Sequence, residues 1–174
     1  GDLKPNCVGH WTMNDNAAST LVLDSSGKGH NGTAMRNTSI LHTTGKIDGA
    51  LTFNGTSDYV DVGNIIGTGA YTKVAWIKRA VGDNYNNIIS SGGANYSHIF
   101  WASYSMSFKL MAGNRTYNTV QDPIPLAADV WYQVAVTFDP NVGSGTMKLY
   151  KNGNQVGNTA TNVPTQSSSP TTYI

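Results

Sequence analysis

The acidic residues of this chain are all of one type, which limits the chemistry that they can perform. All ten are aspartates, and the 174 residues include no glutamate. Hydrolysis of a glycosidic bond uses two carboxyl groups that flank the scissile bond. Asp58 and Asp61 are three residues apart, so a strand would place them on opposite faces. Four others stand alone in expected loops: Asp15, Asp83, Asp122 and Asp129. We therefore expect no hydrolase activity.

Nucleophilic and metal chemistry have little support apart from one glycine-rich segment. Cys7 has no motif beside it, and the four histidines (10, 30, 42 and 98) lack the spacing of a transition-metal site. The segment from Asp24 to Asn31 combines a carboxylate, backbone carbonyls and a side-chain amide, which are the oxygen ligands that Ca²⁺ accepts. Asp24 is thus a candidate ligand of a structural Ca²⁺. The alternative is that Asp24 caps a turn whose glycines adopt positive φ.

Aromatic residues near polar side chains suggest recognition of sugars. Aromatic rings pack against the apolar faces of pyranoses, while Asn, Asp and Arg bond the hydroxyl groups. Surface tyrosines are also common in protein interfaces, so the residue types do not separate the two kinds of ligand. Asn95 and Asn114 lie close in sequence to the main aromatic cluster. The candidate ligand-binding residues are Tyr85, Tyr96, Trp101, Tyr104, Arg115 and Tyr117.

The elements that must position these residues are strands. Alternation places Leu51 and Phe53 on one face, and it makes a stripe of Tyr132, Val134, Val136 and Phe138. About a dozen short strands separated by turns predict an all-β fold of two packed antiparallel sheets. No segment shows a sustained helical period.

Two Asn-Gly pairs mark the expected tight turns. Residues 45–62 read as two alternating strands joined at Asn54-Gly55, and Asn152-Gly153 is the strongest hairpin signal in the chain. Both turns support the antiparallel arrangement.

Charge and hydropathy exclude two classes of partner. The net charge is +1 and the basic residues are scattered, so we expect no nucleic-acid binding. No apolar run approaches the roughly 20 residues of a membrane-spanning helix, so we expect no membrane insertion. We expect residues 1–7 to form an entry arm or a linker and residues 8–174 to form one domain.

Seven motifs occur in order along the chain: Trp11, Asp24-x-Ser-Gly-x-Gly-x-x-Gly32, Gly49-Ala-Leu-x-Phe-x-Gly55, Asp58-Tyr-Val-x-Val62, Val74-Ala-Trp-Ile-Lys78, Trp131-Tyr-Gln-Val-Ala-Val-Thr-Phe-Asp139 and Leu149-Tyr-Lys-Asn-Gly153. In this order they resemble one family of recognition modules, the laminin-G-like branch of the concanavalin A-like lectin/glucanase superfamily. The resemblance implies a two-sheet jelly roll, a fold often found in secreted, cell-surface or virion proteins that bind glycans or proteins. It also implies that Trp76 and Trp131 are core residues.

With no paired carboxylates, the resemblance favours a non-catalytic, lectin-like carbohydrate-binding module. The alternative is a structural or adhesive protein-interaction module, such as a phage-fibre or capsid-decorating domain. The sequence stops at residues 170–174, inside an apparent strand, whereas the family usually continues to a closing strand. We therefore expect an open C-terminal edge, from a shortened chain or one completed by a partner's strand.

Overall fold

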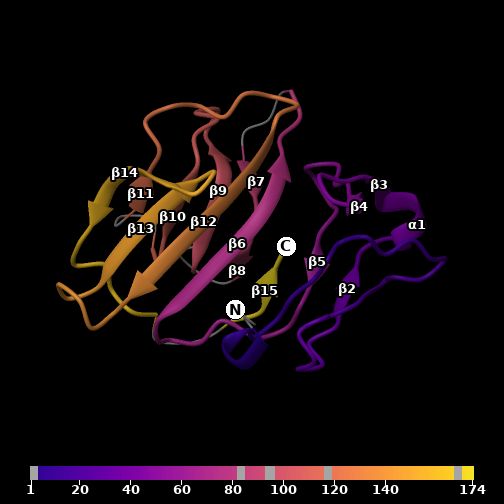
Figure 1. The fold of residues 1–174 in the computed structure, drawn as a ribbon, viewed down its shortest axis with the longest axis horizontal. Coiled ribbons are helices and arrows are strands. Elements are labelled where there is room, and N and C mark those ends of the chain that lie inside the picture. The colour runs from indigo at the N-terminus through magenta and orange to yellow at the C-terminus, as the bar shows by residue number, and fades with distance from the viewer. Residues whose placement is uncertain (1–3, 82–84, 93–96, 116–118, 167–169) are drawn as a thin grey trace. The chain divides into compact units, whose positions relative to one another are not determined.

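The computed structural model describes residues 4–81, 85–92, 97–115, 119–166 and 170–174. These residues form two compact units, which Figure 1 shows as ribbons. Unit 1 comprises Gly1–Ile65 with Tyr173–Ile174, and unit 2 comprises Ile66–Thr172. Among the residues that the structure describes, no helix has the length and apolar character needed to cross a membrane.

Unit 1 is built from short strands around a small core. Strand β1 pairs with β2, β2 with β5, and β5 with β15, all antiparallel. A second pair, β3 and β4, follows one turn of helix. The core contains Val22, Leu41 and Val60, with Leu51 and Phe53 packed against it, as their alternation predicts. The elements are η1 (Lys4–Asn6), β1 (Leu21–Val22), β2 (Gly32–Ala34), α1 (Thr38–Leu41), β3 (His42–Thr44), β4 (Gly49–Leu51), β5 (Val60–Asp61) and β15 (Thr172–Tyr173).

Unit 2 contains two four-stranded antiparallel sheets, with orders β14-β13-β12-β6 and β11-β10-β9-β7. The larger core lies between them and includes Phe100, Val134, Val136, Phe138 and Leu149. The inward stripe expected of residues 132–138 is therefore confirmed. The elements are β6 (Tyr71–Lys78), β7 (Tyr85–Asn87), β8 (Ser90–Ser91), β9 (Ile99–Tyr104), β10 (Met111–Gly113), β11 (Thr119–Gln121), β12 (Trp131–Asp139), β13 (Thr146–Lys151) and β14 (Asn154–Ala160).

The two predicted Asn-Gly turns have different outcomes. Asn152 and Gly153 both have positive φ and join β13 to its antiparallel partner β14, so that hairpin is confirmed. The hairpin predicted at Asn54-Gly55 is wrong, because β4 pairs with β3 and β5 pairs with β2. The Asn54 side chain instead accepts hydrogen bonds from the amides of Thr56, Ser57 and Asp58 and closes a local loop.

The C-terminal strand is paired, contrary to the expectation of an open edge. In unit 1, Val60 and Ile174 exchange two backbone hydrogen bonds. In unit 2, the Gly92 amide donates to the Thr171 carbonyl, and the hydroxyls of Ser91 and Thr172 lie 3.3 Å apart. The described end of the chain therefore offers no unpaired edge along β5.

Candidate functional site

An irregularity in β9 brings two of the predicted ligand-binding aromatics together. Asn86 is paired with Ser103 and Asn87 with Trp101, so Ala102 is an extra residue in β9. In a regular strand, residues three apart face opposite sides. The extra residue reverses the alternation, and Trp101 and Tyr104 share one side. Their rings are stacked, with centroids 5.4 Å apart and an interplanar angle of 14°.

This aromatic pair lies on the side of its sheet away from the main core. Phe100 and Ala112 point into the core between the two sheets. Trp101 instead belongs to a separate small cluster with Ile99 and Met111. Trp101 is only 6% exposed, whereas Tyr104 is 38% exposed. The Tyr104 ring is therefore the accessible part of a flat aromatic surface that Trp101 supports from behind.

The other predicted binding residues are placed less completely. The backbone of Tyr85 lies opposite Tyr104 in the register of β7 and β9, but its side chain is outside the described residues. Tyr96 and Tyr117 also lie outside them. Arg115 is exposed two residues beyond the end of β10, where strand alternation no longer fixes its direction.

Asn114, which the sequence places near the aromatics, has a structural role. Its side chain is buried, accepts a hydrogen bond from the Tyr71 hydroxyl (2.6 Å) and donates one to the Pro164 carbonyl (2.9 Å). Both ends of the amide are therefore used inside unit 2, and Asn114 is not placed to bind a sugar hydroxyl.

Sequence reasoning missed a buried polar cluster beneath β6. Lys73 is on the inner side of the strand, where its ammonium donates to the carbonyls of Ile89 (2.9 Å) and His98. Burial lowers the pKa of Lys73 well below its usual value. The His98 ring lies 3.1 Å from the Ser91 hydroxyl and edge-on to Tyr71. Burial, and then the charge of Lys73, lower the pKa of His98 to about 4.

The hydrogen bonds of this cluster point to a structural role. Burial raises the pKa of Tyr71 above its usual range, so its hydroxyl stays protonated and donates to Asn114. Lys73 makes no ion pair with a carboxylate among the described residues. Its ammonium donates to carbonyls in the segments just before β8 and just before β9, which links β6 to those segments. We assign these residues to structure.

Asp24, the candidate Ca²⁺ ligand, holds a turn together. One carboxylate oxygen accepts from the amides of His10 and Ser26, and the other accepts from the Ser26 hydroxyl and the His30 amide, at 2.7–2.9 Å. Burial acts to raise the pKa of Asp24, but these four hydrogen bonds together hold it well below its usual value. Because hydrogen-bond donors occupy both oxygens, this carboxylate does not fit a Ca²⁺ ligand in the described geometry. Gly27 and Gly29 have positive φ, as the turn interpretation requires.

The remaining carboxylates with described contacts also have local partners. Asp58 forms a two-point ion pair with Arg36, which holds the pKa of Asp58 below its usual value, and Asp122 pairs with Lys151. Asp61 and Asp139 each accept an amide two residues further along the chain. In the described part of the chain, no three His, Cys, Asp or Glu side chains are grouped as metal ligands.

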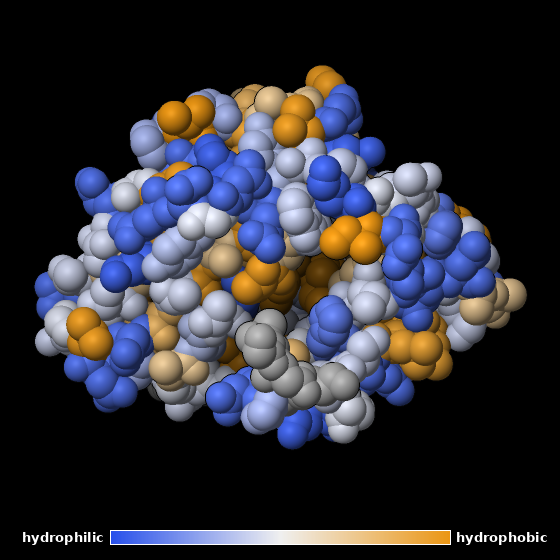
Figure 2. Space-filling view, in the orientation of Figure 1, coloured by the Kyte–Doolittle hydropathy of each residue, from blue (hydrophilic) through white to orange (hydrophobic). Residues whose placement is uncertain are grey.

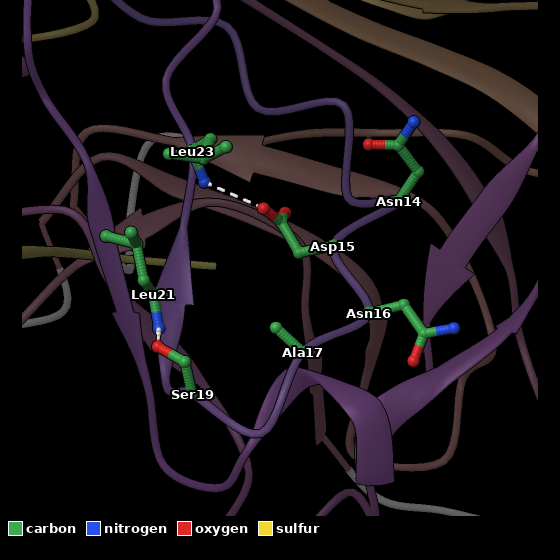
Figure 3. Close-up of a pocket in the computed structure, with 7 residues that line it drawn as sticks. All are labelled: Asn14, Asp15, Asn16, Ala17, Ser19, Leu21 and Leu23. Carbon is green, nitrogen blue, oxygen red and sulfur yellow. Dashed lines mark hydrogen bonds between the residues drawn. The ribbon is translucent and has the colours of Figure 1, made fainter.

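A hollow of about 380 Å³ in unit 1 borders the free edge of β1, the edge that has no strand partner among the residues that the structure describes. In this hollow, the Leu21 amide donates to the Ser19 hydroxyl and the Leu23 amide donates to the Asp15 carboxylate, both at 3.1 Å (Figure 3). The Ser19 and Asp15 side chains therefore already accept hydrogen bonds from amides at the edge of β1. The lining residues are Asn14, Asp15, Asn16, Ala17, Ser19, Leu21 and Leu23.

Trp76 and Trp131, which the family resemblance places in the core, lie on the outer side of the sheet β14-β13-β12-β6. Tyr71, Ala75 and Ile77 contact the main core, so the opposite side of β6 carries Trp76, which is 42% exposed. The prediction that Trp76 is a core residue is therefore wrong. Trp131 is half-buried, and the Lys78 ammonium lies 5.4 Å from the centre of its ring. The side of unit 2 that carries β6, β12 and β13 is mostly hydrophilic, with small hydrophobic patches (Figure 2).

Comparison with known proteins agrees with this architecture. The family described as the concanavalin A-like lectin/glucanases superfamily matches residues 54–174. Among solved structures, the chain is similar to domain 4 of AbnA, a GH43 extracellular arabinanase from Geobacillus stearothermophilus, solved in complex with arabinotriose. The TM-score is 0.67 at 17% identity, over 96% of this chain and 82% of that one. This likeness confirms the predicted β-sandwich fold. No curated protein matches the sequence.

Proposed function

The chain belongs to the concanavalin A-like lectin/glucanase superfamily, and from this premise we propose that it is a non-catalytic carbohydrate-binding module. The observation that carries the proposal is the stacked pair of Trp101 and Tyr104 on the outer side of β9. A flat, partly exposed ring of this kind packs against the apolar face of a sugar, while nearby polar groups bond its hydroxyls. The similar arabinanase domain, which holds arabinotriose, supports this class of ligand.

The role of each residue follows from its exposure. Tyr104 provides the contact surface, and Trp101 fixes the Tyr104 ring from behind. Asn87, which pairs with Trp101 across the strands, and Gln121, which pairs with Met111, are exposed polar residues of the same sheet. Arg115, Tyr85, Tyr96 and Tyr117 remain further candidates around this surface.

The absence of catalysis is part of the proposal. A glycosidase needs two carboxyl groups placed together on either side of the bond. The carboxylates of Asp24, Asp58 and Asp122 are instead engaged in turns and ion pairs. We also propose an extracellular, cell-surface or virion location, where a polysaccharide ligand would be met.

The test is affinity electrophoresis against a panel of polysaccharides, beginning with arabinan. We expect retention of the wild-type chain on at least one of them and about tenfold weaker binding for Tyr104→Ala, the size of a central interface contact. Tyr104→Phe keeps the ring and should keep most of the affinity.

Tyr59→Ala is the matched control, because Tyr59 is 37% exposed and lies in unit 1, edge-on to Tyr173. Equal losses in the Tyr104→Ala and Tyr59→Ala variants would show that the effect is not local. Failure of the wild-type chain to be retained on any polysaccharide would contradict the proposed function.

A further inference from the structure

The outer face of the sheet β14-β13-β12-β6 carries a second group of residues suited to a sugar ligand. Trp76 is directly opposite Gln133, and its neighbour on the same side of β6, Lys78, is opposite Trp131. Directly paired residues have Cβ atoms about 4.5–5.5 Å apart, and residues two apart on one strand are separated by about 6.6 Å. An exposed indole ring, an amide and an ammonium group therefore meet within the area of one or two sugar rings.

The position of Lys78 is restrained by an aromatic ring. Lys78 is exposed, and its ammonium lies 5.4 Å from the centre of the Trp131 ring, within the range of a cation–π contact. This contact reduces the freedom of a long side chain and keeps the charge beside Trp76. Lys78 has no carboxylate partner among the described residues, so its positive charge is available to an anionic ligand.

The surroundings of this group add positive charge and flat surface. Alternation places Lys148 on the same face, together with Val74 and Tyr150, which flank Ala135 in one row across the sheet. Val74 is exposed, like Trp76. Among the described residues of these four strands, the acidic residue that alternation places on this face is Asp139, which lies at the far end of β12 and accepts a hydrogen bond from the Asn141 amide.

From these contacts we infer that Trp76, Gln133 and Lys78 form a second polysaccharide-binding surface, selective for negatively charged sugars. The indole ring packs against the apolar face of the sugar, the Gln133 amide bonds a hydroxyl group, and Lys78 pairs with the carboxylate of a uronate. This surface is on a different sheet from the Trp101–Tyr104 pair. Two surfaces on one module would increase its retention on a long polymer through multivalency.

The experiment is a binding titration of the whole chain with polygalacturonate and with the same polymer after its carboxylates have been reduced to alcohols. We expect binding of polygalacturonate that weakens as salt increases, and much weaker binding of the reduced polymer. Trp76→Ala should weaken binding about tenfold, and Trp76→Phe should retain most of it. Lys78→Met should cost roughly threefold, the size of a screened surface charge contact, and should reduce the salt dependence.

A matched control and two contrary outcomes make the test specific. Ile124→Ala changes an exposed apolar residue of unit 2 outside both surfaces and should leave binding unchanged. Loss of polygalacturonate binding in Tyr104→Ala but not in Trp76→Ala would place the ligand at the first surface. That result would overturn this inference and leave the proposed function intact. A dimer that forms in sedimentation experiments and disappears in Trp76→Ala would make the face a contact between copies, which would also overturn it.

Discussion

Acidification should destabilise unit 2 through His98. His98 is 1% exposed, and burial together with the neighbouring Lys73 lowers its pKa from 6.5 to about 4, against a backbone hydrogen bond to Gly67 that acts in the opposite direction. Above pH 6.5 the ring is neutral in both the folded and the unfolded chain, so it carries no penalty. Below that pH the unfolded chain binds a proton that the folded chain resists.

The size of this effect follows from the two pKa values. The free energy of unfolding should fall by about 1.4 kcal/mol per pH unit between pH 6.5 and 4, by about 3 kcal/mol in all. The pKa values of Asp24 and Asp58 are lowered from 3.8, so the stability that they contribute is lost at lower pH. Lys73, whose pKa is also lowered, changes stability in the same direction as His98.

The assay is urea unfolding at several pH values between 7 and 4, followed by tryptophan fluorescence. Three of the four tryptophans (76, 101 and 131) lie in unit 2, so the signal reports mainly on that unit. His98→Gln should remove most of the slope, and Lys73→Met should reduce it, because the charge of Lys73 helps to lower the pKa of His98. A slope that is the same in wild type and His98→Gln, or a His98 ring that titrates near pH 6.5 in the native protein, would refute this reasoning.

Two further predictions concern turns. Gly145→Ala should lower the free energy of unfolding by roughly 3 kcal/mol or more, because φ is +101° and a Cβ would lie 1.9 Å from the Val163 carbonyl oxygen. Gly153→Ala, at φ +81° with open space around it, should cost only about 1 kcal/mol, and equal losses in thermal denaturation would contradict the role of the clash. Asp24→Ala should cost about 1–3 kcal/mol by leaving the amides of His10, Ser26 and His30 without their acceptor. Hydrogen exchange should show these three amides exchanging faster than in wild type, and unchanged protection would argue against this role of Asp24.

Strand alternation predicted the architecture well where strands are regular. Leu51, Phe53 and the stripe from Tyr132 to Phe138 are where the two-residue period places them. Regular alternation also separated Lys73 from Trp76 on β6, but it did not indicate which side faces the core. The family resemblance implied that the Trp76 side faces the core, and in the structure the Lys73 side does. Lys73 can lie inside because two carbonyls accept hydrogen bonds from its ammonium, and no local pattern announces these long-range partners.

The candidate site depends on a feature that strand alternation does not predict. Trp101 and Tyr104 are both candidates by residue type, but residues three apart in a regular strand face opposite sides of the sheet. Their stacking depends on the extra residue Ala102, which is visible only in the register with β7. The Asn54-Gly55 hairpin failed for a related reason. A favourable turn sequence does not determine which strands pair: β4 pairs with β3, and β5 pairs with β2.

The free edge of β1 has a consequence for how such modules can be crowded together. Ser19 and Asp15 accept the hydrogen bonds of the Leu21 and Leu23 amides, the groups that an incoming strand from another molecule would need. A neighbouring copy would have to displace both side chains and leave the Asp15 carboxylate without its donor. Copies of the module repeated along one polypeptide, or packed densely on a surface, would therefore resist joining through this edge and remain separate binding units.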